Sequence, residues 1–280
     1  MAYAANNDVR LHWQERGFGT PILLVMGVAF SSRMWYPAIP ALSKQHRVIW
    51  FDNRGTGASD TTATVEIGDL ARDAFAVLDA AGVHAAHIYG VSMGGVIVQE
   101  MALQQPKRVL SLIVGCSGAL TAEKPRAPAI ARVLYRLPPW LLGSLMSLMR
   151  RGSAHDYGTA ARPDAIAIDQ AAVKSEKIFS KGSVAQANAL ARYCTTREAI
   201  EGLTMPALVL HGDEDTAVKF DVGEELAGIL PNSRFVPFKG AGHNYMIAYK
   251  DEANQAVLDF TREVDAAETA PAGQEASIHG

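Results

Sequence analysis

The chain has 280 residues, of which 26 are basic and 29 acidic, so its charges nearly cancel. Hydrophobic residues make up 49% of it and charged residues 20%, an ordinary globular composition that excludes a disordered or collagen-like protein. The sequence has no block of lysine and arginine of the kind that binds phosphates, so we do not expect nucleic acid as a partner.

The length suits one large domain with an insertion better than two independent domains. Cys116 and Cys194 show no metal-ligand spacing and are too few for a disulfide framework, which favours two reduced thiols. The first residues lack the basic and apolar regions of a signal peptide, so we expect a cytoplasmic protein. The longest apolar stretch, residues 137–149, is interrupted by proline and glycine and is shorter than the ~20 residues that span a bilayer. No membrane anchor is therefore expected.

Short aliphatic runs alternate with longer helix-patterned segments, which predicts an α/β fold with a mostly parallel sheet flanked by helices. Residues 9–14 alternate apolar and polar side chains, as expected of a strand at an edge of the sheet. Buried strands are predicted at residues 22–26, 47–52, 87–91, 110–115, 207–212 and 234–238. Helices are predicted at residues 67–81, 93–105, 219–230 and 251–264.

One region breaks this rhythm, because residues 117–203 show helix-like stretches punctuated by proline and no strand pattern. We interpret them as a helical cap inserted into a core that consists of residues 1–116 and 204–264. The apolar segment 138–149 of the cap lines an entry tunnel or forms the interior of the cap itself. Residues 265–280 are small, polar and unperiodic, so we expect a disordered tail.

A candidate nucleophile follows the predicted strand at residues 87–91. Here the sequence is GVSMGG, residues 90–95, and a predicted helix follows, which is the strand-turn-helix context of a Gly-x-Ser-x-Gly nucleophile elbow. Gly90 and Gly94 lack side chains, so strand and helix can approach closely. The Ser92 hydroxyl is then expected above the sheet, with the Met93 amide available to a developing oxyanion.

An unactivated serine is a weak nucleophile, so this chemistry also needs a histidine and a carboxylate to orient it. His243 follows the last predicted strand in a glycine-rich turn, at the carboxyl edge of the sheet where Ser92 is expected. The preceding strand ends in HGDED, residues 211–215, and one of its three acids is expected to orient His243. The order serine, acid, histidine along the chain favours this reading over a merely solvated acidic loop. The poorer histidine candidates lie in or beside strands, in the insertion or in the tail: His12, His46, His84, His87, His155 and His279.

Four segments together resemble the α/β-hydrolase-fold serine hydrolases, of the esterase, lactonase and enol-lactonase type, over roughly residues 9–264. They are the elbow GVSMGG, the loop DNRGTGAS at residues 52–59, the HGDED segment and the loop GAGH at residues 240–243. The resemblance implies the α/β-hydrolase fold with an inserted helical cap.

The resemblance also implies roles for individual acids. The family's acid lies three residues after the loop glycine, which corresponds to Asp215 and leaves Asp213 and Glu214 as bystanders. Asp52 and Arg54 are implied to fix a loop below the active site without taking part in the chemistry.

The chain departs from the family's pattern after its second predicted strand, where relatives commonly carry His-Gly and this chain has Met26-Gly27. By position, the Val28 amide is the second oxyanion donor beside the Met93 amide. A backbone donor does not depend on the identity of the side chain, so we keep both donors as expectations.

These residues predict attack of Ser92 on an acyl carbonyl and hydrolysis through an acyl-enzyme, with no cofactor and no metal. The resemblance implies a carboxylic ester or lactone as the substrate. Carbon-carbon bond hydrolysis of diketones and cofactor-free perhydrolysis stay open as alternatives. Haloalkane and epoxide chemistry are disfavoured, because relatives that perform them carry an aspartate where this chain has Ser92. A non-catalytic small-molecule receptor on the same fold is an alternative of a different class.

The cap is rich in Leu, Ile, Met and Ala, and its charges are mixed in sign, which predicts a small apolar ester or lactone as substrate. An acidic lactone is a live alternative, because the insertion also carries arginines that can hold a carboxylate. The sequence does not indicate the oligomeric state. The arginines are Arg126, Arg132, Arg136, Arg150 and Arg151.

Overall fold

The computed structural model describes residues 2–121, 156–176, 178 and 180–269. These residues form an eight-stranded sheet in the order β1-β2-β4-β3-β5-β6-β7-β8. The six strands from β4 to β8 in this order pair in parallel, whereas β2 is antiparallel to both of its neighbours. The strands are β1 (Ala2–Asn6), β2 (Val9–Arg16), β3 (Pro21–Val25), β4 (Arg47–Phe51), β5 (Ala86–Val91), β6 (Val109–Gly115), β7 (Ala207–Gly212) and β8 (Ser233–Phe238).

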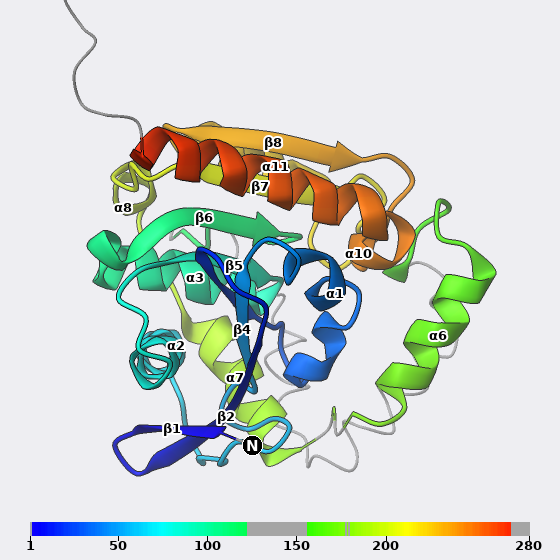
Figure 1. Cartoon of the computed structure of the whole chain (residues 1–280). Coiled ribbons are helices and arrows are strands. Elements are labelled where there is room, and N and C mark those ends of the chain that lie inside the picture. The colour runs from blue at the N-terminus through cyan, green and yellow to red at the C-terminus, as the bar shows by residue number, and fades with distance from the viewer. Residues whose placement is uncertain (1, 122–155, 177, 179, 270–280) are drawn as a thin grey trace, which may run out of the picture.

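Helices cover the sheet, and α6 (Pro163–Val173), the first described helix after β6, lies beyond the carboxyl ends of β6, β7 and β8 (Figure 1). The helices are α1 (Ile39–Leu42), α2 (Ile67–Ala80), α3 (Met93–Gln104), α6 (Pro163–Val173), α7 (Lys181–Arg192), α8 (Arg197–Glu201), α9 (Phe220–Ile229), α10 (Tyr245–Ala248) and α11 (Lys250–Thr269). Two short 3-10 turns are η1 (Ser32–Trp35) and η2 (Pro106–Arg108).

The alternation of side chains along the strands divides the hydrophobic core into two clusters, one on each face of the sheet. Leu23 on β3 packs in the cluster that contains residues of α2, α3 and α9. Its neighbours Ile22 and Leu24 pack in the other cluster, with residues of α1, α10 and α11. Because both faces are covered, the central strands are apolar on both sides, which is why they appear as continuous hydrophobic runs in the sequence. The predicted α/β architecture with a mostly parallel sheet is confirmed.

The expectation that residues 9–14 form an edge strand is wrong. β1 pairs with the outer side of β2, with Ala4 opposite Leu11, so β1 is the edge. The two strands form a hairpin whose turn places Asn7 at a positive φ of 51°, a conformation that asparagine tolerates better than most residues. The short, alanine-rich segment before this turn carries little strand signal of its own, so the pairing becomes visible only in the fold.

The prediction that a disordered tail begins at residue 265 is wrong, because α11 continues to Thr269. The carboxylate of Asp265 accepts a hydrogen bond from His87 on β5, which attaches the end of this helix to the sheet. An exposed helix end can be polar and unperiodic, so composition alone did not separate it from a disordered tail. Residues 270–280 lie outside the described residues.

In the described part of the predicted cap, α6, α7 and α8 follow one another between β6 and β7. An isolated parallel bridge between Thr121 and Thr195 joins the two ends of this insertion. The apolar segment 138–149 and the five arginines named above as candidates to hold a carboxylate lie outside the described residues. Among the residues that are described, we find no helix with the length and apolar character needed to cross a bilayer.

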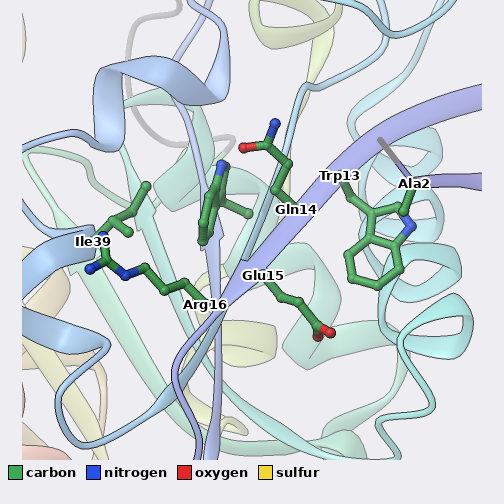
Figure 2. Close-up of a pocket in the computed structure, with 7 residues that line it drawn as sticks. Ala2, Trp13, Gln14, Glu15, Arg16 and Ile39 are labelled. Carbon is green, nitrogen blue, oxygen red and sulfur yellow. The ribbon is translucent and has the colours of Figure 1, made fainter.

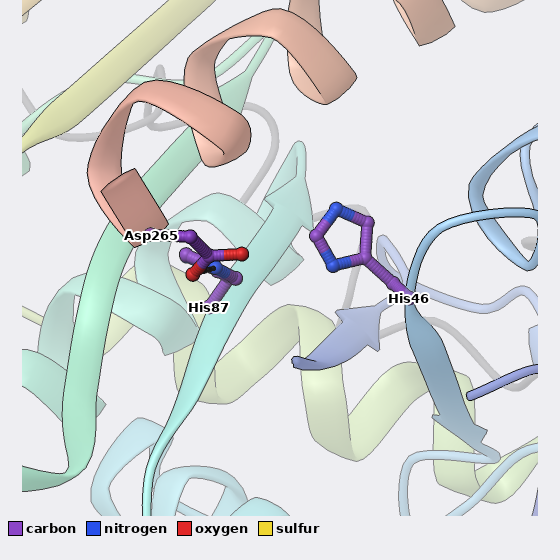
Figure 3. A group of neighbouring side chains, drawn as sticks. All are labelled: His46, His87 and Asp265. Atoms are coloured by element: carbon purple, nitrogen blue, oxygen red, sulfur yellow. Dashed lines mark hydrogen bonds and ion pairs between the residues drawn. The ribbon is translucent and has the colours of Figure 1, made fainter. Parts of the chain in front are cut away.

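A buried histidine pair attaches α11 to the amino ends of the central strands (Figure 3). His87 donates from Nε2 to Asp265 Oδ1 over 3.0 Å, and its Nδ1 lies 2.8 Å from Ser111 Oγ. Both ring nitrogens of His46 also have partners, at 2.8 and 3.0 Å. Burial lowers the pKa of His87 to about 4, although the Asp265 carboxylate acts in the opposite direction. The neutral imidazole is therefore the form that the fold stabilises.

We predict that the free energy of unfolding decreases as the pH falls from about 6.5 towards about 4, because the unfolded chain then takes up a proton on His87 that the folded chain does not. Over the whole window this effect amounts to roughly 3 kcal/mol. His87→Asn should flatten the pH dependence, as measured by urea denaturation at pH 7, 6 and 5. The matched control is His84→Asn at an exposed histidine, which should keep the wild-type slope. An unchanged slope in His87→Asn would contradict the prediction.

Candidate active site

Ser92 occupies the sharp turn between β5 and α3. Its φ of 56° and ψ of −123° lie in a region that L-residues rarely adopt, at a cost of roughly 1–3 kcal/mol. The Ser92 N–H donates to the Gly115 carbonyl over 2.9 Å and holds the turn against β6. A Cβ added at Gly90 would overlap the Gly94 backbone, and one at Gly94 would overlap the end of β3. Strand, helix and serine can therefore meet only with glycine at both positions.

The structure brings Asp215 and His243 into direct contact, on the loops that follow β7 and β8. His243 Nδ1 donates to Asp215 Oδ2 over 2.7 Å; the Asp215 side chain is fully buried and that of His243 is 21% exposed. Asp215 Oδ1 accepts the amides of Ala217 and Val218 at 2.8 and 2.9 Å. Burial by itself raises the pKa of Asp215, but hydrogen bonds from His211 and His243 outweigh it and hold the pKa far below its usual range. The carboxylate stays ionised, and the His243 proton on Nδ1 leaves Nε2 free to accept another.

The other two acids of the same segment have different partners. Asp213 Oδ1 accepts the Gly240 amide at 2.5 Å, and both Glu214 oxygens accept from Thr159, at 2.7 and 2.8 Å. Asp213 and Glu214 are both exposed. They stabilise the loop before His243 and its contact with the cap, and neither makes a hydrogen bond to the imidazole.

His211, at the end of β7, also contacts the acid, which sequence reasoning missed. Its Nε2 lies 2.9 Å from the Val218 carbonyl and 3.3 Å from Asp215 Oδ2, and its ring is buried beside Phe220. A carbonyl can only accept, so Nε2 carries the proton and the ring donates towards the oxygen that also holds His243. The spacing of four residues between His211 and Asp215 in HGDED is the signal that could have indicated this contact.

Ser92, Asp215 and His243 all follow the carboxyl ends of neighbouring parallel strands, β5, β7 and β8, with β6 between the first two. Within the described residues no hydrogen bond joins Ser92 Oγ to His243. Such contacts are often long in the absence of substrate and shorten when it binds, so the arrangement is compatible with proton transfer between them. The fold brings Asp215 and His243 together and places Ser92 at the same edge of the sheet.

The loop after β3, residues 26–32, lies beside Ser92 and is called the oxyanion loop below, after the role that the sequence predicts for it. A Cβ added at Gly27 would lie 3.2 Å from Ser92 Cβ and 3.7 Å from Ser92 Oγ. Among the described residues neither the Val28 amide nor the Met93 amide donates to a protein acceptor, so both are free to bind an anionic oxygen. Val28 is half-buried and Met93 is buried at the amino end of α3.

Asp52 and Arg54 belong to two buried hydrogen-bond networks. Asp52 Oδ1 accepts both the amide and the hydroxyl of Ser32, at 2.8 and 2.7 Å, which supports the end of the oxyanion loop. Asp52 Oδ2 lies 3.1 Å from His12 Nδ1. The Arg54 guanidinium pairs with the buried carboxylate of Asp73 on α2.

Two groups of side chains in the described part of the chain have the composition of a metal site. His46, His87 and Asp265 already satisfy one another and their neighbours with hydrogen bonds. In the other group, burial and the Asp215 carboxylate raise the pKa of Cys116 well above its usual value, so the sulfur is a neutral thiol instead of a metal-binding thiolate. The first group therefore has no ring nitrogen to spare, and the second offers a neutral thiol where a metal would take a thiolate.

A surface depression of about 560 Å³ lies beside the β1–β2 edge of the sheet, and Ser92, Asp215 and His243 are not among its lining residues (Figure 2). Its walls come from β1, β2, β4 and α1: Ala2, Trp13, Gln14, Glu15, Arg16, Ile39 and Trp50.

Comparison with known proteins gives consistent matches. The family described as alpha/beta hydrolase fold matches residues 20–247. A putative carbamate hydrolase, RutD of Azorhizobium caulinodans, is 30% identical and aligns over 95% of this chain and 100% of its own. A pimeloyl-[acyl-carrier protein] methyl ester esterase of Aliivibrio salmonicida is 28% identical over 86% of this chain and 92% of its own. The solved structure of Est816, an N-acyl homoserine lactone degrading enzyme, has a TM-score of 0.77 and 25% identity, covering 92% of this chain and 100% of that one.

We predict that Asp215→Asn slows covalent labelling of Ser92 by a fluorophosphonate by about 10²- to 10⁴-fold, because an amide holds the His243 tautomer poorly and does not stabilise its cation. Asp213→Asn is the matched control, since its amide oxygen can still accept from Gly240 and no imidazole depends on it. Its labelling rate should stay within about threefold of wild type. Labelling is followed by intact mass, and a slower reaction in Asp213→Asn than in Asp215→Asn would assign the acid to Asp213.

Proposed function

The chain belongs to the alpha/beta hydrolase fold family, and from this membership we propose that it is a serine hydrolase that cleaves a carboxylic ester or lactone through an acyl-enzyme. The observation that carries the proposal is the 2.7 Å hydrogen bond between His243 and the buried Asp215, at the sheet edge where the strained Ser92 turn lies. A binding protein has no need of a strained serine and an oriented imidazole at one edge.

The reaction begins when His243 Nε2 takes the proton of the Ser92 hydroxyl as its oxygen attacks the substrate carbonyl. The carbonyl oxygen becomes an oxyanion, which accepts hydrogen bonds from the Met93 and Val28 amides. The tetrahedral intermediate then collapses and expels the alkoxide, which receives the proton from His243. Water attacks the resulting ester of Ser92 with the same base, and the second collapse releases the acid and restores the serine.

Asp215 supports both halves of this cycle. Its carboxylate keeps the His243 proton on Nδ1, so Nε2 is the basic nitrogen, and it stabilises the imidazolium that forms after each proton transfer. The hydrogen bonds from the Ala217 and Val218 amides fix the carboxylate in place, so little reorganisation accompanies the reaction.

The names of the relatives support an acyl compound as substrate, since they include a methyl ester esterase, a lactone-degrading enzyme and a putative carbamate hydrolase. In all three compound classes a carbonyl carbon bears a heteroatom leaving group. Among these we propose a small, neutral, apolar ester or lactone, on the apolar composition of the insertion. Carbon-carbon bond hydrolysis and perhydrolysis use the same nucleophile and base, so substrate tests separate them from ester cleavage.

We predict that Ser92→Ala lowers kcat for the best ester by about 10³-fold or more, because only the oxyanion amides and substrate binding then remain. The fold should be preserved, because the side chain makes no hydrogen bond among the described residues, and unfolding curves of the two proteins check this. A folded variant with near-native turnover would show that Ser92 is not the nucleophile.

A substrate panel tests the proposed specificity. It compares neutral alkyl and aryl esters, neutral lactones, carboxylate-bearing lactones, an N-substituted carbamate and a vinylogous diketone at equal concentration. We expect the highest kcat/KM for neutral esters or lactones. Turnover confined to carboxylate-bearing lactones would indicate a cationic site in the insertion. Turnover of the diketone alone would indicate a carbon-carbon hydrolase. If no compound of the panel is hydrolysed, the receptor alternative is favoured.

A further inference from the structure

We propose that Gln186, on cap helix α7, is a positioning residue that holds the oxyanion loop in its working shape, so that this loop is complete only when the cap helix is docked on the core. The kinetic part of this inference rests on the proposed function, whereas the structural part does not. Gln186 is fully buried and joins two core segments that lie far from it in sequence.

The carboxamide of Gln186 uses both of its polar atoms in this contact. Its Oε1 accepts the Ala29 amide at 2.8 Å, and its Nε2 donates to the Arg54 carbonyl at 2.8 Å. Ala29 has a positive φ of 70°, which an alanine adopts only when its surroundings enforce it. The hydrogen bond to Gln186 is such a constraint, and it acts on the residue directly after Val28.

The proposed donor peptide, between Gly27 and Val28, is thereby held on both sides. On its other side the Met26 carbonyl accepts from Asn53 Nδ2 at 2.9 Å, and Asn53 is fully buried. Asn53 and Arg54 are consecutive residues, and Arg54 accepts a hydrogen bond from Gln186. Asn53, Arg54 and Gln186 are therefore connected and hold the backbone on both sides of the donor peptide. The contact from Asn53 comes from the core, and the contact from Gln186 comes from the cap.

Helix α7 can reach the loop because its first turn packs directly on the core. A Cβ added at Gly182 would overlap the Gly55 backbone, so the two chains approach at van der Waals distance. Ser180 Oγ lies 3.2 Å from the Gly55 carbonyl and also accepts the Ser183 amide, which caps the helix. Gln186 lies one turn further along α7, so this contact between the helix and the core determines where Gln186 lies.

A second contact from the same part of the chain supports the far end of the oxyanion loop. The carboxylate of Glu176 accepts both the amide and the hydroxyl of Ser31, each at 2.8 Å. Two residues of the insertion thus hold two backbone amides of the loop, at Ala29 and Ser31. The hydrogen bonds of these two amides in the oxyanion loop therefore depend on the insertion.

The structural test measures amide hydrogen exchange across residues 26–32 in the complete chain. Gln186→Met has a similar volume but neither polar atom, and we expect it to raise the exchange rate of the Ala29 amide about tenfold. Gln186→Glu keeps an oxygen that can accept this amide, so its Ala29 exchange should stay closer to wild type. Gln170→Met, at an exposed glutamine of α6, is the matched control and should change nothing in this segment. Wild-type exchange in Gln186→Met, or equal loss of protection in the Met and Glu variants, would overturn the proposal.

The kinetic test uses the best ester from the panel. Since a displaced oxyanion donor acts in the transition state, Gln186→Met should lower kcat by about 10- to 100-fold while KM changes less than about threefold. Its affinity for a trifluoromethyl ketone, which forms an oxyanion on Ser92, should fall in parallel with kcat. Active-site titration with a fluorophosphonate corrects kcat for any misfolded fraction, so a merely destabilised cap would leave the corrected kcat unchanged and overturn the positioning role.

The two proposals fail in different ways. A wild-type chain that turns over no ester and reacts with no fluorophosphonate would overturn the proposed function, and the exchange experiment would still decide whether Gln186 holds the loop. Normal wild-type turnover together with unchanged exchange and kcat in Gln186→Met would overturn the positioning role alone.

Discussion

The turn between β5 and α3 imposes a constraint on which the arrangement of the site depends. Strand and helix meet so closely that both flanking positions must be glycine, and Ser92 is left with a φ of 56° between them. Backbone strain of this kind persists only where the surrounding structure enforces it. Here the sheet on one side and the buried helix on the other do so. The result is a hydroxyl beside the amino terminus of α3, where the Met93 amide donates to no acceptor among the described residues.

The loops that carry the other functional groups are less constrained by the sheet, and the insertion supports them. The loop of His243 is bonded to residues 156–160 by three backbone hydrogen bonds, in which the Ala160 amide donates to Gly240 and the Tyr157 and Asp156 carbonyls accept from Gly242 and Asn244. The oxyanion loop is bonded to α7 and to Glu176. The loop of His243 and the oxyanion loop are therefore both held by hydrogen bonds from the insertion, although they follow β8 and β3, which lie on opposite sides of β5.

Buried polar groups serve different purposes at the two ends of the sheet. At the amino end, the neutral histidine pair attaches α11 and contributes to stability, with every ring nitrogen in a hydrogen bond. At the carboxyl end, the Asp215 carboxylate is kept ionised by donors from two histidines and two amides, and the His243 side chain remains partly exposed. Burial raises the energetic cost of an unpaired charge in both places, and the hydrogen-bond partners determine which form is stable.

The sequence by itself predicted the strands from β2 to β8, the main helices of the core and a contact between His243 and an acid of residues 213–215, because hydrophobic periodicity, glycine spacing and the order of motifs can be read along the chain. The family resemblance selected Asp215 among the three acids. It identified the edge strand and the end of α11 incorrectly, because the alanine-rich β1 carries little strand signal of its own and Asp265 is attached to the sheet by a hydrogen bond to the distant His87. Only the tertiary structure decided that His211 contacts the acid and that Gln186 contacts the oxyanion loop. A hydrogen bond between residues 157 positions apart leaves no periodic pattern in either segment, and the folded chain alone brings its two ends together.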